Sequence, residues 1–245
     1  MTTPDSYRQK VYDSYLTSAG VSHADLGANY SIRLPYLQYL VRNFFPTDRT
    51  VRTVDFGCGY GALIKCARSM GYTNVTGIDD SAEQVAAAKA FGVDGVSAGN
   101  IFTIVKSISD ASVDMIITID VLEHMRKDEL VSYVLEMQRI LKPAGSWLIH
   151  VPNAEGPLGP SIFFADFTHE TMFTRSSLRQ LLATAGFSKV QTFEDKPIAH
   201  GFLSTVRRIF WEIIRLRWRF LVAVETGNLD KSRIYSQCML ALVRK

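Results

Sequence analysis

Short apolar runs of strand length alternate with longer amphipathic segments along most of the chain. Runs rich in β-branched residues predict strands near 50–55, 74–79, 94–97, 113–119, 146–151, 189–194 and 234–243. Apolar positions at helical spacing predict helices near 34–45, 61–70, 81–91, 128–141 and 176–185, and a long helix within 198–225. This alternation is typical of a parallel sheet with helices on both faces, whose ligands bind at the carboxyl ends of the strands.

Two segments stand outside this alternation. Residues 1–30 form a polar lead-in to the helix predicted at 34–45, which Pro46 ends. Residues 152–174 predict a long loop that contains four phenylalanines as well as glycine and proline. A loop of more than ~15 residues in a compact domain is usually functional or disordered. This second segment is therefore a candidate for function.

The composition is that of an ordinary globular protein. The 245 residues, 47% hydrophobic and 21% charged, predict one α/β domain over 1–245, with an N-terminal helical segment (1–45) and an inserted helix (198–225). A net charge of +3 gives no general indication of nucleic-acid binding. The three cysteines lack zinc-ligand spacing and fit a reducing compartment. Since no signal-peptide run or membrane span is evident, we expect a cytoplasmic location.

A glycine-rich loop, VDFGCGYG at 54–61, lies where the first strand gives way to a helix. Glycines there let the backbone pass close to a ligand. The carboxylate of Asp55 could meet an ammonium group, and backbone N–H groups near the helix start could meet a carboxylate. The next strand ends at Asp79, which is placed to accept hydrogen bonds from both hydroxyls of a ribose.

Other phosphate or nucleotide loops fit this segment poorly. A dinucleotide site has the pattern G-x-G-x-x-G, in which the third glycine stands three positions after the second, whereas G-C-G-Y-G-A-L has other spacing. A Walker loop ends in Gly-Lys-Ser/Thr, which is absent from this segment. A plain surface turn would not require the acidic residues that follow.

Over about 45–195 the sequence resembles the class I S-adenosylmethionine-dependent methyltransferases. DFGCGYG at 55–61 matches their first motif, Asp79 their ribose-binding acid, and DVLEH at 120–124 their fourth motif. The resemblance implies a Rossmann-like sheet of seven strands with the last antiparallel, a helical insertion before that strand, and S-adenosylmethionine as cofactor. The residues that it assigns to the cofactor are Asp55, Phe56, Gly57, Cys58, Gly59, Gly61, Asp79, Asp80, Asn100, Ile101, Asp120, Val121 and His124.

His169, in the long loop, is the best candidate for a catalytic base. An alcohol acceptor has to lose a proton during methylation, and a neutral imidazole near pH 7 can take it. We expect His169 to be this base and Asp166 to orient it; alternatively, both only hold the loop in place. A divalent metal on Asp166, His169 and Glu170 is a weaker alternative, and no metal is expected. His124 could be structural or catalytic, and His150 is expected to be buried scaffold.

A second resemblance concerns the acceptor. VPNAEG, DFTHE and SLRQLL, within 150–187, occur in this order in methyltransferases associated with bacterial surface polysaccharide and lipopolysaccharide synthesis. This implies O-methylation of a sugar or glycan, with Phe163, Phe164 and Phe167 as a possible apolar platform for a sugar face. Quinone-like or other small lipid-soluble acceptors, methylated on O or C, remain an alternative. A cofactor-binding partner protein without turnover is another.

Residues 202–222 combine aromatic and basic side chains. Phe202, Val206, Ile209, Ile213, Leu216 and Phe220 share one helical face, and Arg208, Glu212, Arg215 and Arg219 share the opposite one. Five arginines against one glutamate give this segment a charge of +4. It could pack on the core with its arginines in solvent, form a homodimer or a lid, or lie on an anionic membrane surface.

Overall fold

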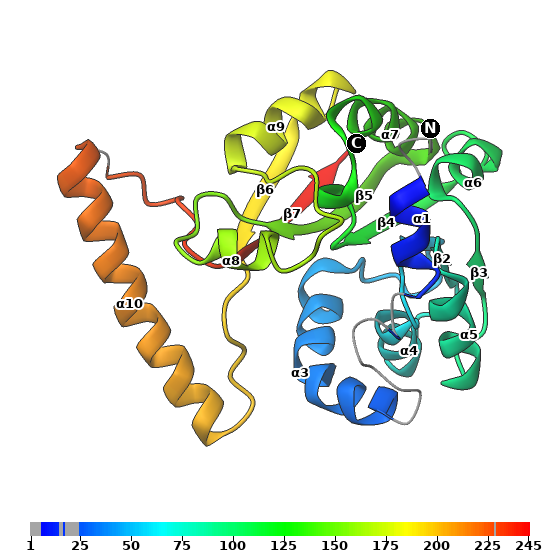
Figure 1. Cartoon of the computed structure of the whole chain (residues 1–245), viewed down its shortest axis with the longest axis horizontal. Coiled ribbons are helices and arrows are strands. Elements are labelled where there is room, and N and C mark those ends of the chain that lie inside the picture. The colour runs from blue at the N-terminus through cyan, green and yellow to red at the C-terminus, as the bar shows by residue number, and fades with distance from the viewer. Residues whose placement is uncertain (1–5, 15–16, 18–24, 228) are drawn as a thin grey trace.

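The protein is a seven-stranded sheet with helices on both faces (Figure 1). The computed structural model describes residues 6–14, 17, 25–227 and 229–245. The strands are β1 (Thr53–Phe56), β2 (Val75–Asp79), β3 (Val96–Ala98), β4 (Val113–Ile119), β5 (Leu141–Pro152), β6 (Lys189–Glu194) and β7 (Cys238–Arg244). The helices are α1 (Ser6–Tyr12), α3 (Leu26–Phe44), α4 (Ala62–Ser69), α5 (Ala82–Ala90), α6 (Ile101–Ser107), η2 (Leu122–His124), α7 (Lys127–Ile140), α8 (Gly159–Phe163), α9 (Arg175–Thr184) and α10 (Phe202–Thr226).

The strand order is β3-β2-β1-β4-β5-β7-β6, and β7 runs in the opposite direction to the other six strands. The predicted fold class is confirmed, including the antiparallel last strand and the helical insertion before it. The order reverses between β1 and β4, because β1 pairs with β2 on one side and with β4 on the other. A reversal of this kind opens a crevice at the carboxyl ends of the two central strands.

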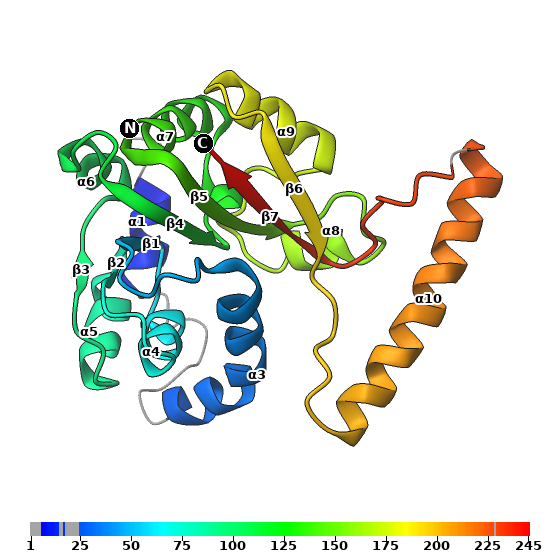
Figure 2. The ribbon, with the colours of Figure 1, turned by 180° about the vertical axis from the view of Figure 1, so that it is seen from behind.

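Alternating side chains on the central strands supply two apolar layers. From β4, Ile116 packs with α6, α7 and α9, whereas Met115 and Ile117 pack with α3, α4 and α5. Because successive side chains of a strand point to opposite faces, both faces need a helical cover. Figure 2 shows the sheet between these helices.

The prediction of a polar lead-in over 1–30 was wrong for the residues that the structure describes. Helix α1 forms over Ser6–Tyr12, and α3 begins at Leu26, well before the predicted start near 34. Leu26 is buried, so the apolar pattern of α3 extends further toward the N-terminus than was predicted. Pro35 lies inside α3, where it removes one backbone hydrogen bond without ending the helix. Residues 1–5, 15–16 and 18–24 of this lead-in lie outside the described residues.

The segment 152–174 is not structureless, because it contains α8 and is tied to the sheet at both ends. Asn153 is fully buried, and its Nδ2 donates to the carbonyl oxygens of Ile234 and Ser236 at 3.1 and 2.9 Å. Residue 153 also forms a β-bridge with Phe173. The buried residues 234–236 therefore serve as an anchor for this loop, and β7 begins only at Cys238, later than the predicted 234.

Helix α10 stands apart from the rest of the molecule in both views (Figures 1 and 2). None of its residues is buried, which contradicts the alternative of a helix packed on the core with its arginines in solvent. Within the described part of the chain, no helix combines the length and the apolarity needed to cross a membrane.

Candidate active site

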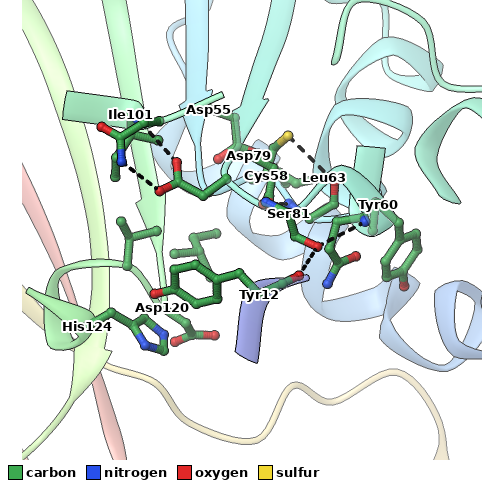
Figure 3. A pocket seen from close by; sticks show the side chains of 18 of the residues that line it. Tyr12, Asp55, Cys58, Tyr60, Leu63, Asp79, Ser81, Ile101, Asp120 and His124 are labelled. Atoms are coloured by element: carbon green, nitrogen blue, oxygen red, sulfur yellow. Dashed lines mark hydrogen bonds between the residues drawn. The ribbon is translucent and has the colours of Figure 1, made fainter. Parts of the chain in front are cut away.

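A cavity of about 550 Å³ opens at the carboxyl ends of β1, β2 and β4, where the strand order reverses (Figure 3). Eleven of the thirteen predicted cofactor residues line it, so four separate segments of sequence converge on one space. They are Asp55, Gly57, Cys58, Gly59, Asp79, Asp80, Asn100, Ile101, Asp120, Val121 and His124. The cavity is the size of an ordinary ligand pocket, roughly 300–1,000 Å³.

Phe56 and Gly61 do not line this cavity, contrary to the prediction. Phe56 points into the core, where its ring meets the edge of Tyr133 at 6.1 Å. Its position in β1 explains this, because it alternates with Asp55 across the sheet. Gly61 precedes α4 with a φ of +75° and faces Val93. Both residues shape the loop without facing the space that it encloses.

The glycine loop is tightly packed at Gly57 and open at Gly59. Gly57 has a φ of +71°, and a Cβ at this position would overlap the Cγ2 methyl of Val121. Gly59 has a φ of +55°, but the nearest atom to its Cβ position would be Gln84 Oε1, at 3.6 Å. Positive φ favours glycine at both positions. A side chain at Gly57 is therefore disfavoured both by the backbone conformation and by lack of space, whereas one at Gly59 is disfavoured by the backbone conformation alone.

Three backbone N–H groups of this loop tie it to the end of β2. Those of Gly57 and Cys58 donate to the carbonyl of Ile78 at 2.8 and 3.2 Å, and that of Gly59 donates to Asp79 Oδ2 at 2.7 Å. The first turn of α4, beginning at Ala62, also borders the cavity. A ligand carboxylate therefore has to be met by this turn or by a side chain rather than by the glycine amides.

The acidic side chains of the cavity differ in burial: Asp55 is almost fully buried, whereas Asp79 and Asp80 are half-buried. Burial raises the pKa of Asp55 well above its usual range, and the neighbouring Asp79 raises it further. Burial also raises the pKa of Asp79, although bonds from the amides of Ser81 and Gly59 act against it. A cationic ligand group beside these carboxyl groups would favour their charged forms.

Asp80 and Asn100 connect β2 to the start of α6. Asp80 Oδ1 accepts from the amide of Ile101 at 2.8 Å, and its Oδ2 accepts from Asn100 Nδ2 at 3.3 Å. Asn100 Oδ1 accepts from the amide of Thr103 at 3.2 Å and caps α6. Burial raises the pKa of Asp80 to about 6. Asn100, one of the predicted cofactor residues, thus borders the cavity with its side chain held by hydrogen bonds.

Asp120, at the end of β4, is held by a buried histidine. His150 bridges two carboxylates, with Nδ1 2.6 Å from Asp120 Oδ1 and Nε2 3.1 Å from Asp195 Oδ2. Burial alone would lower the pKa of His150, but Asp120, Tyr36 and Asp195 together raise it well above its usual range. Asp120 has a φ of +57°, which is rare for a residue with a side chain. The charged imidazole therefore acts as a scaffold that keeps this strained turn in place.

A relay of hydrogen bonds fixes His124 at the rim of the cavity. The hydroxyl of Thr168 donates to Asp166 Oδ1 at 2.6 Å, so it accepts from His124 Nδ1 at 2.8 Å. His124 therefore carries its proton on Nδ1. Burial and the neighbouring His169 lower the pKa of His124 to about 4. The side chain is neutral near pH 7, and its Nε2 carries a lone pair.

His169 lies beside His124, with ring centroids 4.7 Å apart. Its Nδ1 is 2.6 Å from the backbone carbonyl of Phe163, and since a carbonyl can only accept, Nδ1 carries the proton. The ring also stacks on Phe163 at 5.4 Å. Its Nε2 is then the basic nitrogen. The bond that orients His169 comes from Phe163, while the carboxylate of Asp166 orients Thr168.

Asp166 and His169 also form a potential metal-ligand group, but with a different third member than predicted. Their ligand atoms and one of His124 all lie within 4.8 Å of one another. Glu170 instead accepts a hydrogen bond from the hydroxyl of Tyr7. The prediction that the site works without a metal stays a prediction.

Helix α1 supplies cavity residues that the sequence analysis missed. Arg8 is buried, and its guanidinium donates to the carbonyl of His124 and to both carboxylate oxygens of Glu129. Tyr12 crosses the cavity with its ring edge-on to His124 at 6.2 Å (Figure 3). Its carbonyl accepts from Ser81 Oγ at 2.7 Å. The spacing of Arg8 and Tyr12 on one helical face was a signal in the sequence, but the segment was too short to read as a helix.

Arg33 was missed as well, because it lies in the part of α3 that precedes the predicted helix. Its side chain lines the cavity, and its charge contributes to lowering the pKa of Asp120. Within the described residues, the Arg33 guanidinium makes no hydrogen bond or ion pair. It is therefore available to an anionic group of a ligand.

Comparisons with known proteins agree with this geometry. A family model described as "Methyltransferase domain" matches residues 30–192. A Mycolicibacterium smegmatis protein named "Probable S-adenosylmethionine-dependent methyltransferase" is 30% identical over 154 residues, which cover 59% of this chain. The alignment spans 54% of that relative, so the chain matches about half its length.

Solved structures of low sequence identity share the fold. A SAM-dependent methyltransferase from Archaeoglobus fulgidus is 18% identical and has a TM-score of 0.62, with 96% of this chain and 99% of that one covered. Phosphoethanolamine N-methyltransferase 2 of Haemonchus contortus, solved with S-adenosyl-L-methionine, is 16% identical with a TM-score of 0.63. It covers 96% of this chain and 60% of its own. At this identity the likeness concerns the fold alone.

Proposed function

The chain belongs to the methyltransferase domain family and uses S-adenosylmethionine as its cofactor, and on this premise we propose that it methylates a hydroxyl group of a sugar or glycan. The observation that carries the proposal is the pair of neighbouring histidines, His124 in the cavity wall and His169 beside it. His169 is fixed through Nδ1, so its Nε2 can accept a proton beside the cavity wall formed by His124. Hydroxyl acceptors need such a base, because they lose their proton as the new bond forms.

The cavity residues fit the cofactor. Buried polar atoms at its wall have no hydrogen-bond partner within the described part of the chain, among them Gln84 Oε1 and the hydroxyl of Tyr60. The buried carboxyl group of Asp55 also faces the cavity. Unsatisfied buried polar groups are costly, so a polar ligand that satisfies them gains affinity. Asp79 and Asp80 would hold the ribose, and Asn100 the adenine.

Arg33 is the natural partner for the carboxylate of the methionine end, because the amides of Gly57, Cys58 and Gly59 already donate to Ile78 and Asp79 of β2. We expect Arg33→Ala to raise the Kd for S-adenosylmethionine by roughly 10- to 100-fold, since a hydrogen bond to a charged group contributes about 1.5–3 kcal/mol. Isothermal titration measures this change. Arg42→Ala, on the same helix and away from the cavity, is the control, and equal affinities in all three proteins would contradict the role of Arg33.

The chemistry required of the protein is modest. S-adenosylmethionine supplies an electrophilic methyl group when it is bound. The side chains have to orient the acceptor, exclude water and remove one proton. His169 would take the hydroxyl proton on Nε2, while the carbonyl of Phe163 stabilises the resulting imidazolium at Nδ1. Tyr12 and Arg8, on α1, would cover the cavity and limit the entry of water.

The loop also supplies apolar surface near this base. Phe164 and Phe167 are 80% and 85% exposed, although large apolar side chains are usually covered. Aromatic rings that lie open to solvent beside a polar site suit the apolar face of a sugar ring. They would also suit a flat quinone-like acceptor, and this is the second candidate.

A screen of acceptors tests the proposal directly. Labelled methyl donor is incubated with free sugars, nucleotide-linked sugars, oligosaccharides and catechol-type quinone precursors, and the transfer of label is measured. We expect transfer to at least one sugar hydroxyl and an alkali-stable product, as an ether requires. Transfer only to the quinone precursors would favour the second candidate. A protein that binds the cofactor, yet methylates no member of either class, would count against both.

A further inference from the structure

Helix α10 presents most of its large apolar side chains to solvent, and it turns Arg208, Glu212 and Arg215 toward the protein. Ten large apolar side chains along its outer face are exposed by 42–82%. They are Phe202, Leu203, Ile209, Phe210, Ile213, Ile214, Leu216, Phe220, Leu221 and Val224. We call this set, together with Arg217 among them, the outer face of α10. A helix that covers a core has the opposite orientation.

The inner side of the helix is held by ionic contacts. Arg215 Nε lies 3.1 Å from Glu194 Oε1 at the end of β6, and Arg208 Nη1 donates to the carbonyl of Pro197 at 3.2 Å. Glu212 pairs with both arginines on the same side. These contacts determine which side of α10 faces the protein, so the outer face cannot pack against the hydrophobic core.

We propose that the outer face of α10 docks onto an anionic lipid surface. The helix has 25 residues, so it would lie along the interface for about 37 Å. An interfacial helix of this kind sinks its apolar face roughly 5–10 Å below the head groups. Such a helix binds without crossing the membrane, in line with its hydropathy.

The positive charge on the outer face favours an anionic lipid surface over a second copy of the chain as its binding partner. Arg217 is surrounded by Ile213, Ile214, Phe220 and Leu221 one turn away on either side. It has no ion pair among the described residues, and the outer face as defined contains no carboxylate, although exposed Glu225 lies at its border two turns beyond Arg217. Two such faces packed together would bury unpaired guanidinium groups, which is costly. Lipid phosphates supply the missing negative charge within reach of the long side chain.

The charge balance and the tryptophans of the helix agree with a lipid surface. Five arginines and two glutamates leave α10 with a charge of 5 − 2 = +3. Arg207 is exposed at the border of the outer face and has no ion pair within the described part of the chain. Trp218, 36% exposed, lies at the same border. Tryptophan and arginine are enriched where a helix meets the head-group layer.

Co-sedimentation of the full chain with vesicles tests the proposal. We expect binding to phosphatidylcholine vesicles that contain phosphatidylglycerol to exceed binding to phosphatidylcholine alone by about tenfold or more, and to weaken with added salt. Arg217→Glu reverses one charge and should lower the partition coefficient on anionic vesicles by roughly 30-fold. Ile213→Asp with Phe220→Asp should lower it at least as much on either vesicle, since both side chains leave the apolar layer.

The matched control is Ile32→Asp, which places the same charge at an equally apolar and 77% exposed position on α3. It should bind vesicles like the unchanged chain. All variants should keep the melting temperature and cofactor affinity of the unchanged chain, because the altered side chains are exposed. Absence of vesicle binding, or binding that survives the double substitution, overturns the proposal. So does a dimer in sedimentation velocity that the double substitution dissociates, because a second copy then covers this face.

Discussion

Gly57→Ala is expected to lower the melting temperature by roughly 5–15 °C and to weaken S-adenosylmethionine binding by at least about 100-fold. Two costs combine. A residue with a Cβ at a φ of +71° is strained by about 1–2 kcal/mol, and the new methyl would overlap Val121 Cγ2. Overpacking of this kind costs about 1–3 kcal/mol more. Val121 lines the cavity, so any shift that relieves the overlap also moves the wall of the cofactor site.

Two further variants separate these costs. Gly59→Ala carries only the backbone strain, because its Cβ would have no atom nearer than 3.6 Å, and it should melt within about 5 °C of the unchanged chain. Val121→Ala in the Gly57→Ala background removes the overlapping methyl and should recover part of both losses. Thermal melting and titration calorimetry give the two readouts. Normal cofactor affinity in Gly57→Ala would show that the turn can relax without moving the wall.

The framework around Gly57 was predictable because local sequence and global fold agree there. The motif 54–61 follows a β-branched strand and precedes a helix, and the topology rules of parallel sheets then bring Asp55, Asp79 and Asp120 to one edge. Their separation along the chain does not matter, since each ends a neighbouring parallel strand. This is why most of the predicted cofactor residues line one cavity.

What the sequence left open depends on tertiary contacts. Helix α1 is only seven residues long, too short to be stable alone, and it forms against His124, Glu129 and Ser81. Arg33 could not be placed at the cavity, because α3 begins earlier than was predicted. The periodicity of apolar residues also does not show that a helix can continue through Pro35. Likewise, the residue pattern of α10 predicted an apolar and a basic face but not which of them faces solvent. That orientation depends on the ion pair between Arg215 and Glu194.

The hydrogen bonds of the histidines were a further limit. From spacing alone, Asp166 was the expected partner of His169, three residues away. The structure instead pairs His169 with the backbone of Phe163, and Asp166 with Thr168. Every residue has a backbone carbonyl, so the sequence does not indicate which one accepts a hydrogen bond from a histidine. The protonated nitrogen of each ring could therefore be assigned only from the structure.

This assignment leads to the sharpest test of the proposed base. The side-chain amide of asparagine can take the place of His169 Nδ1 and donate to the Phe163 carbonyl, but it has no counterpart of Nε2 that accepts a proton. If His169 is the base, His169→Asn and His169→Ala should both lower kcat by about 10²- to 10⁴-fold, with the cofactor Kd unchanged within about twofold. If His169 only holds the loop, His169→Asn should keep most of the turnover, whereas His169→Ala should lose it.

The pH dependence and the response to chelation complete this test. Titration of His124 should not change kcat above pH 5, since its pKa of about 4 leaves its side chain neutral there. Treatment with a chelator should leave kcat unchanged. Loss of turnover that a divalent cation restores would instead mean that His124, Asp166 and His169 bind a metal, in which case Nε2 of His169 is occupied and another group must take the proton.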